Sequence, residues 1–270
     1  MSDLEQKLEY LQWLNTIGIE YYYSDKKAST KSLLEKISSK KPQVAKIQKG
    51  PIATLQPQTI EKYREKKLGN TDSRELANQA TSIEDLRLKV SSFDGCELKK
   101  FATNTVFADG NANAQVLLIG EAPGASEDEL GLPFCGQSGV LLDKIMASIN
   151  LSRQKNLYIT NTIFWRPPAN RRPSQLEIEI CKPFVEKHIA LIKPKLIILV
   201  GATAANALLG QGIEISKLRH DYYSYTNVYL DEPITTAAIF HPAYLLRQPN
   251  KKKDTWFDLL KIQQLILETK

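Results

Sequence analysis

The sequence predicts an α/β fold: a three-layer sandwich with a central parallel four-stranded sheet flanked by helices. Four short apolar runs, bounded by polar residues or glycine, predict the strands at residues 115–120, 157–161, 195–201 and 234–240. Segments with helical periodicity separate these runs, and strands that alternate with helices form a parallel sheet covered on both faces. The chain has 270 residues, 42% hydrophobic and 24% charged, which excludes collagen-like and wholly disordered proteins.

The first part of the chain predicts an N-terminal helix followed by a flexible basic linker. Leucines recur at helical spacing, at Leu4, Leu8, Leu11 and Leu14. Residues 26–49 contain eight lysines and one acidic residue, Glu35. This composition fits a solvated linker, and it also fits a basic arm that follows a phosphate backbone. We therefore divide the chain into residues 1–81, the helix and lysine-rich linker, and residues 82–270, a compact domain.

Helix signals separate the strands of the compact domain. Ser82 with Asp85, and Ser174 with Glu177, have the spacing of helix N-terminal caps. Helices are expected from residue 82 onward and over residues 138–149, 174–192, 202–210 and 251–268.

Composition limits the class and location of the protein. No apolar run approaches the ~20 residues of a membrane span, so no membrane partner is expected. The first residues have neither the basic nor the apolar region of a secretory signal. Three cysteines cannot build a disulfide framework, which favours a reducing, cytoplasmic location. The net charge of +6 permits a nucleic-acid partner without demonstrating one.

The first predicted strand is followed by a loop that can hold a ligand. In parallel α/β sheets, ligands bind beyond the carboxyl ends of the strands. Gly120 and Gly124 flank Glu121, Ala122 and Pro123, and glycines let backbone N–H groups approach a ligand closely. A tight turn with solvated acidic side chains is the alternative.

Three other side chains near strand ends can complete a pocket for a planar base. Phe134 lies in a glycine-rich loop, where its ring can stack on a base or fill the core. Asn161 ends a strand and can read the edge of a nucleobase or cap a turn. His241 also follows a strand and can donate to a developing oxyanion. Together, such groups can hold one heterocyclic base that has been flipped out of a DNA double helix.

A short apolar segment follows His241. Leu245 and Leu246 stand next to Arg247, an arrangement that suits a wedge entering a DNA base stack beside a phosphate contact. Packing of one of the two leucines in the core is also expected.

Four segments together resemble the uracil-DNA glycosylase superfamily: GEAPGASED, GLPFCGQSG, YITNTIFWRPPANRRP and HPAYLLR. The resemblance is to the family-4-like branch of bacteria and archaea, of the alphaproteobacterial type, and it covers about Phe93 to the C-terminus. It implies the same parallel four-stranded sheet, and a monomeric enzyme that cleaves the N-glycosidic bond of a flipped uracil in DNA. The product is an abasic site, which starts base-excision repair.

The resemblance also implies roles for the residues around the base. Phe134 stacks on uracil, and Asn161 bonds its O4/N3 edge. His241 contacts O2, together with main-chain amides of the loop that contains Gly120, Ala122 and Gly124. Glu127 lies near C5, where it helps to exclude the methyl group of thymine.

Further roles concern the DNA and the chemistry. Leu245 or Leu246 fills the vacated base stack, and Arg247 touches phosphate. His241 acts catalytically by stabilising charge on O2. Related families carry aspartate where this chain has Ala122, which leaves Glu121 as the candidate to steady the sugar cation or orient water.

The sequence departs from the family pattern at the positions that bind the family's cofactor. Family 4 members usually hold a [4Fe–4S] cluster through four cysteines. The matching positions here are Phe93, Cys96, Trp165 and Cys181, and Cys135 lies elsewhere. We therefore expect no metal and no cofactor, with Cys96 and Cys181 as remnants and with Phe93 and Trp165 filling the vacated space.

Two alternatives remain at the level of the sequence. A non-catalytic DNA-binding or replication-associated module could retain the base pocket, as Ala122, the missing cluster ligands and the lysine-rich arm suggest. A small-molecule enzyme of Rossmann type is less consistent, because the chain lacks a GxGxxG fingerprint followed by a ribose-binding acid.

Overall fold

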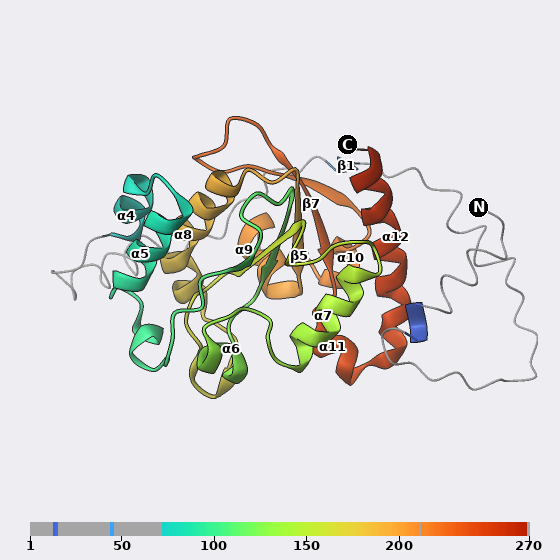
Figure 1. The fold of residues 1–270 in the computed structure, drawn as a ribbon, viewed down its shortest axis with the longest axis horizontal. Helices are drawn as coiled ribbons and strands as arrows, with labels where there is room; N and C mark the ends of the chain where they lie inside the picture. The colour runs from blue at the N-terminus through green and yellow to red at the C-terminus, as the bar shows by residue number, and fades with distance from the viewer. Residues whose placement is uncertain (1–12, 16–43, 46–71, 211, 269–270) are drawn as a thin grey trace, which may run out of the picture.

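The computed structural model describes residues 13–15, 44–45, 72–210 and 212–268. It has a central sheet with helices packed on both faces (Figure 1). Most of the predicted N-terminal helix and of the lysine-rich segment lies outside the described residues, although residues 13–15 are helical.

The described sheet has seven strands in the order β1-β6-β7-β5-β3-β4-β2. Their bounds are Val44–Ala45 (β1), Asp109–Gly110 (β2), Val116–Gly120 (β3), Leu157–Asn161 (β4), Leu196–Val200 (β5), Tyr222–Tyr225 (β6) and Ile234–Ile239 (β7). The four predicted strands, β7, β5, β3 and β4, pair in parallel as neighbours, so the predicted parallel core is confirmed. The sheet is wider than predicted, because β2 and β6 add antiparallel strands on either side and β1 pairs in parallel with β6.

Nine α-helices lie within residues 72–210 and 212–268, around this sheet. Their bounds are Ser73–Gln79 (α4), Ile83–Ser92 (α5), Ala125–Leu130 (α6), Gln137–Ala147 (α7), Gln175–Ile192 (α8), Ala202–Leu209 (α9), Ile215–Leu218 (α10), Pro242–Arg247 (α11) and Lys252–Glu268 (α12). The capping side chains of Ser82 and Ser174 accept from the backbone N–H of Asp85 and Glu177, so both predicted caps are confirmed.

The core lies in two apolar layers, one on each face of the sheet. Every residue of β3 is buried, and successive residues point to opposite layers: Leu117 packs toward α5 and α8, and Leu118 toward α7 and α12. Figure 1 shows α4, α5 and α8 on one side of the sheet, and α7, α11 and α12 on the other. Burial on both faces explains why these strands read as continuous apolar runs.

The packed unit begins earlier than the predicted boundary at Ser82. Asp72 caps α4, whose residue Ala77 is fully buried. Arg74 of α4 forms an ion pair of 2.6 Å with Glu186 of α8. Trp13 is also buried, with its ring centroid 5.0 Å from that of Trp256 in α12, so part of the predicted N-terminal segment packs on the domain.

Within the described ranges, every helix is too short or too polar to span a bilayer.

Candidate active site

The carboxyl ends of the central strands bring four of the predicted residues together. Gly120 ends β3 and is paired directly with Asn161, which ends β4. The ring centroids of Phe134 and His241 lie 5.7 Å apart, with an interplanar angle of 31°. A Cβ atom on Gly120 would overlap both the Phe134 ring and Asn161 Oδ1, so glycine is needed for this close approach.

Asn161 carries a buried hydrogen-bond acceptor that lacks a partner. The residue is 1% exposed, and no hydrogen bond reaches its Oδ1 from the described part of the chain. An unpaired buried carbonyl costs free energy, so its retention beside an aromatic ring points to a ligand that supplies the donor.

His241 is held as a neutral hydrogen-bond donor. It caps α11, and its Nδ1 accepts from the backbone N–H of Ala243 at 3.1 Å. Nδ1 therefore carries no proton, and the proton resides on Nε2. Burial, and then the positive charge of Arg247, lower the pKa of His241 to about 4, so the imidazole is neutral at pH 7.

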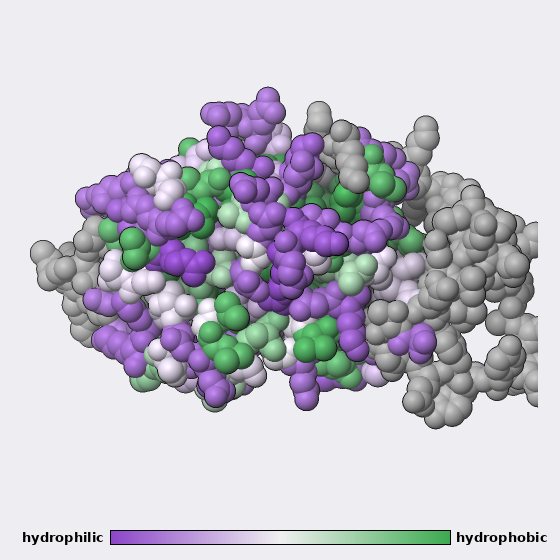
Figure 2. Space-filling model, viewed as in Figure 1, coloured by the Kyte–Doolittle hydropathy of each residue, from purple (hydrophilic) through white to green (hydrophobic). Residues whose placement is uncertain are grey.

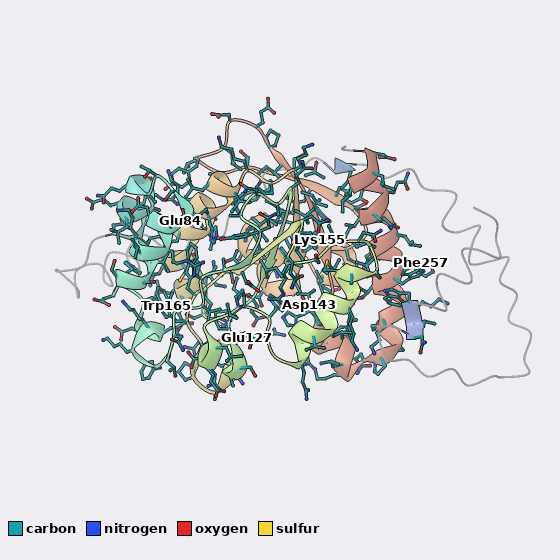
Figure 3. All side chains as sticks on the ribbon, in the orientation of Figure 1. Glu84, Glu127, Asp143, Lys155, Trp165 and Phe257 are labelled. Atoms are coloured by element: carbon teal, nitrogen blue, oxygen red, sulfur yellow. The ribbon has the colours of Figure 1, made fainter. Side chains whose placement is uncertain are left out.

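Glu127 links the loop that follows Gly120 to the loop that contains Phe134. Its Oε2 accepts from the N–H of Gly124 at 3.1 Å, and its Oε1 accepts from the N–H groups of Cys135 and Gly136, each at 2.9 Å. Glu127 belongs to α6 and is labelled in Figure 3. The sequence singled out Glu127 as a group facing the base, whereas the structure gives its carboxylate three main-chain partners.

The Gly120–Gly124 loop is also fixed from β4. The hydroxyl of Thr162 donates to the carbonyl oxygen of Glu121 at 2.5 Å. The backbone N–H of Thr162 donates to the carbonyl oxygen of Gly120 at 2.9 Å. Glu121 and Ala122 are both half-buried. Among the described residues, no salt bridge or hydrogen bond involves the Glu121 carboxylate.

The structure separates the two adjacent leucines of α11. Leu245 is 0% exposed and belongs to the apolar layer with α7 and α12, as expected for the one of the two leucines that packs in the core. Leu246 is 43% exposed, and Arg247 beside it is exposed as well. Val140 of α7 is 54% exposed, and Figure 2 shows apolar surface over the region of α7 and α11. Leu246 and Arg247 therefore lie at the surface, and their contact with DNA stays a prediction.

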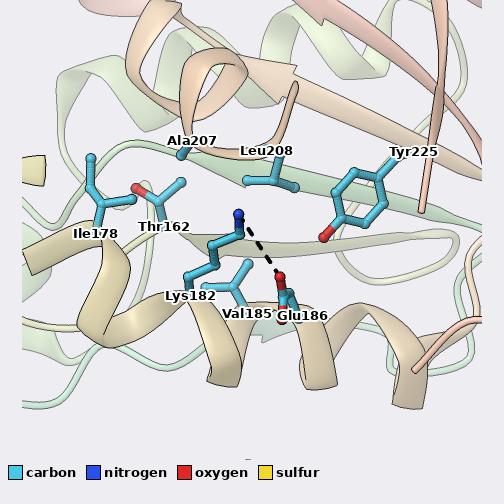
Figure 4. A pocket seen from close by; sticks show the side chains of 8 residues that line it. All are labelled: Thr162, Ile178, Lys182, Val185, Glu186, Ala207, Leu208 and Tyr225. Atoms are coloured by element: carbon cyan, nitrogen blue, oxygen red, sulfur yellow. Dashed lines mark ion pairs between the residues drawn. The ribbon is translucent and has the colours of Figure 1, made fainter. Parts of the chain in front are cut away.

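A cavity beside α8 and α9 is too small to hold a base. It is lined by Thr162, Ile178, Lys182, Val185, Glu186, Ala207, Leu208 and Tyr225 (Figure 4). Its volume of ≈ 10 Å³ suits about one water molecule. None of Gly120, Phe134, Asn161 and His241 lines this cavity.

The chain is an α/β protein that gathers an aromatic ring, an amide and an imidazole near the carboxyl ends of its central strands, and comparison with known proteins identifies the family. Residues 107–261 match the family model of the Uracil DNA glycosylase superfamily, and the chain belongs to this superfamily. It is 34% identical over 193 residues to the Type-4 uracil-DNA glycosylase of Sulfurisphaera tokodaii, a match that covers 70% of this chain and 87% of that protein. It is also 34% identical over 188 residues to the Type-4 uracil-DNA glycosylase of Archaeoglobus fulgidus, covering 68% and 93% respectively.

The residues at the expected cluster positions do not fit a four-cysteine iron–sulfur cluster. Phe93 and Trp165 are buried, and their ring centroids lie 6.4 Å apart. Cys96 and Cys181 are buried as well, and their mutual hydrogen bond, together with burial, raises the pKa of the Cys181 thiol well above its ordinary value. In the described residues, no group of three or more His, Cys, Asp or Glu side chains is arranged to hold a metal ion.

Proposed function

We propose that this protein is a uracil-DNA glycosylase that hydrolyses the N-glycosidic bond of a flipped uracil in DNA and leaves an abasic site. The observation that carries this proposal is the convergence of Phe134, Asn161 and His241 around Gly120, in a chain that belongs to the superfamily. Each of these side chains offers a contact that a pyrimidine needs.

Base recognition follows from the groups in the pocket. The Phe134 ring stacks on the face of uracil, and Asn161 Oδ1 accepts from the N3–H group while the Asn161 amide donates to O4. Glu127 near C5 remains a predicted barrier to the thymine methyl group. Its three main-chain hydrogen bonds support that role, because they prevent the side chain from moving aside.

Catalysis depends on interactions that strengthen as the glycosidic bond breaks. Cleavage leaves an oxocarbenium-like sugar and places negative charge on uracil O2. The Nε2–H of His241 and the amides of the Gly120–Gly124 loop stabilise that charge, which lowers the barrier rather than only tightening binding. Glu121 is our candidate to orient the attacking water or steady the sugar cation.

The activity is tested with an oligonucleotide that contains one uracil, followed by alkaline cleavage. We expect strand scission at the uracil position and none in the matched oligonucleotide with thymine at that position. If the folded protein binds DNA in a salt-sensitive way but yields no abasic product from single or double strands, it is a non-catalytic DNA-binding module instead.

We also propose that the protein works without an iron–sulfur cluster. The packing of Phe93 against Phe184, with ring centroids 5.2 Å apart, supports this, since aromatic side chains occupy the region of two missing ligands. Protein purified without oxygen is expected to contain only trace iron and acid-labile sulfide. About four of each per chain would contradict the proposal.

The partner is uracil-containing DNA, as expected for the family. The monomeric state and the cytoplasmic location remain predictions. Three cysteines without disulfide bonds support a reducing compartment.

A further inference from the structure

The backbone at Phe134 has a conformation that a non-glycine residue rarely adopts. Its φ angle is +52°, in the left-handed region. Gly139 in α7 lies directly against it, and a Cβ atom on Gly139 would overlap the Phe134 carbonyl group. The orientation of the ring that faces the base therefore depends on a backbone geometry that other groups must hold in place.

Arg153, in the turn between α7 and β4, binds this backbone directly. Its Nη1 donates to the carbonyl oxygen of Pro133 at 2.6 Å, and its Nη2 donates to that of Phe134. The side chain is only 10% exposed. Two consecutive carbonyl groups of the Phe134 loop are thus held by one buried cation.

Two carboxylates orient the same guanidinium group. Arg153 Nε donates to Asp143 Oδ1 of α7 at 2.8 Å, and Nη1 donates to Asp109 Oδ2 of β2 at 3.0 Å. Burial alone lowers the pKa of Arg153, but these two carboxylates outweigh it and raise the pKa above its ordinary value. The planar, five-donor guanidinium serves both carboxylates and both carbonyls, which a lysine ammonium cannot do in the same geometry.

The following residues of the Phe134 loop are held by a negatively charged side chain. Glu127 accepts from the next two N–H groups, those of Cys135 and Gly136. The carbonyls of residues 133 and 134 therefore face a cation, and the amides of residues 135 and 136 face an anion.

We propose that Arg153 is a positioning residue of the active site, which fixes the left-handed Phe134 peptide so that the ring is already placed to stack on the base. This inference rests on the proposed function, since it assigns Arg153 to the same base pocket. Arg153 acts through Phe134 and does not touch the base itself.

A double-mutant cycle tests the inference. Arg153→Met is expected to lower kcat/KM on the uracil oligonucleotide by about 10²-fold, because small displacements of a positioned group cost about that much. In the Phe134→Ala background, the same change is expected to cost less than about threefold, since no ring remains to be positioned. An equal loss in both backgrounds would show that Arg153 acts in another way and would overturn the proposal.

Asp143→Asn provides the matched control. It removes the charge of one Arg153 partner, whose side chain is 49% exposed, but leaves the carbonyl contacts in place. If the ion pair mattered only for stability, Asp143→Asn and Arg153→Met would lower activity in proportion to their effects on the thermal midpoint. We expect Asp143→Asn, in which the amide oxygen can still accept from Arg153 Nε, to lower kcat/KM far less than Arg153→Met does. If Arg153→Met does not fold, Arg153→Lys enters the same cycle.

A crystal structure of Arg153→Met gives a result that does not depend on activity. We expect Phe134 to leave the left-handed region and its ring to move away from His241. An unchanged Phe134 would refute the positioning role, whereas failure of the wild-type protein to release uracil would refute the proposed function only.

Discussion

Asn161→Ala is expected to lower kcat/KM for uracil excision by about 10³-fold, because the site then lacks the amide that we propose reads the base edge. Stability is expected to change little. Asn161 Oδ1 is buried without a partner, which costs about 1–3 kcal/mol, and its removal offsets the small cavity that alanine leaves. The measurements are single-turnover excision and denaturant unfolding, with the free energy of unfolding within about 1 kcal/mol of the wild type.

Arg247→Ala is the matched control for Asn161→Ala. Arg247 is exposed on α11 and is expected to contact a phosphate, so its loss should weaken DNA binding. The slope of the logarithm of the binding constant against the logarithm of the salt concentration should decrease in magnitude by about one. Asn161→Ala should leave that slope unchanged. A larger loss of activity in Arg247→Ala than in Asn161→Ala would contradict the assignment of Asn161 to base recognition.

The second large effect concerns His241 and pH. Because burial and Arg247 lower the pKa of His241 to about 4, kcat/KM is expected to show no inflection from His241 between pH 8 and pH 5 and to fall as the pH approaches 4. Protonation places a proton on Nδ1, which then cannot accept from the N–H of Ala243, and the ring loses its orientation. His241→Ala is expected to lower kcat/KM by about 10²-fold and to abolish this acidic limb.

Arg247→Ala also tests the cause of the shifted pKa. Without the nearby positive charge, the pKa of His241 should rise, and the acidic limb of the rate profile should move to higher pH. An inflection near pH 6.5 in the wild-type protein would show that the imidazole titrates as in water, and would contradict the buried neutral donor.

Folding stability should follow the same titration. The pKa of His241 is lower in the folded protein than in the unfolded chain, so between pH 6.5 and pH 4 the unfolded chain binds more protons. The contribution of neutral His241 to the free energy of unfolding is therefore complete above pH 6.5, the pKa in the unfolded chain. This contribution is lost as the pH falls from 6.5 to about 4.

Those parts of the fold that follow from burial on both faces could be predicted from the sequence. The four central parallel strands are mostly apolar, and the caps at Ser82 and Ser174 have a recognisable spacing. The strand β6 could not be found in this way, because its sequence, YYSY, is neither a continuous apolar run nor a clear alternation. The short helix α4 is mostly polar, and its burial depends on its contact with α8.

The residues of the candidate site differ in whether the sequence alone could identify them. Side chains that face the base have distinctive chemistry, and Phe134, Asn161 and His241 could be selected for that reason. Arg153, and the main-chain contacts of Glu127, could not be predicted, because their partners are carbonyl and N–H groups that nearly every residue carries. The choice between Leu245 and Leu246 needed the orientation of α11, since neighbouring residues on a helix point in different directions.

The unpaired oxygen of Asn161 has a consequence for undamaged DNA. Cytosine, the base from which uracil arises by deamination, presents a lone pair at N3 and an amino group at position 4, the reverse of the uracil pattern. Placed in this pocket, its N3 would meet Asn161 Oδ1 lone pair to lone pair, and the tightly packed Gly120 and Phe134 leave the amide little room to rotate. On the proposed binding mode, cytosine would thus be repelled, and undamaged DNA would be spared abasic sites at its cytosines.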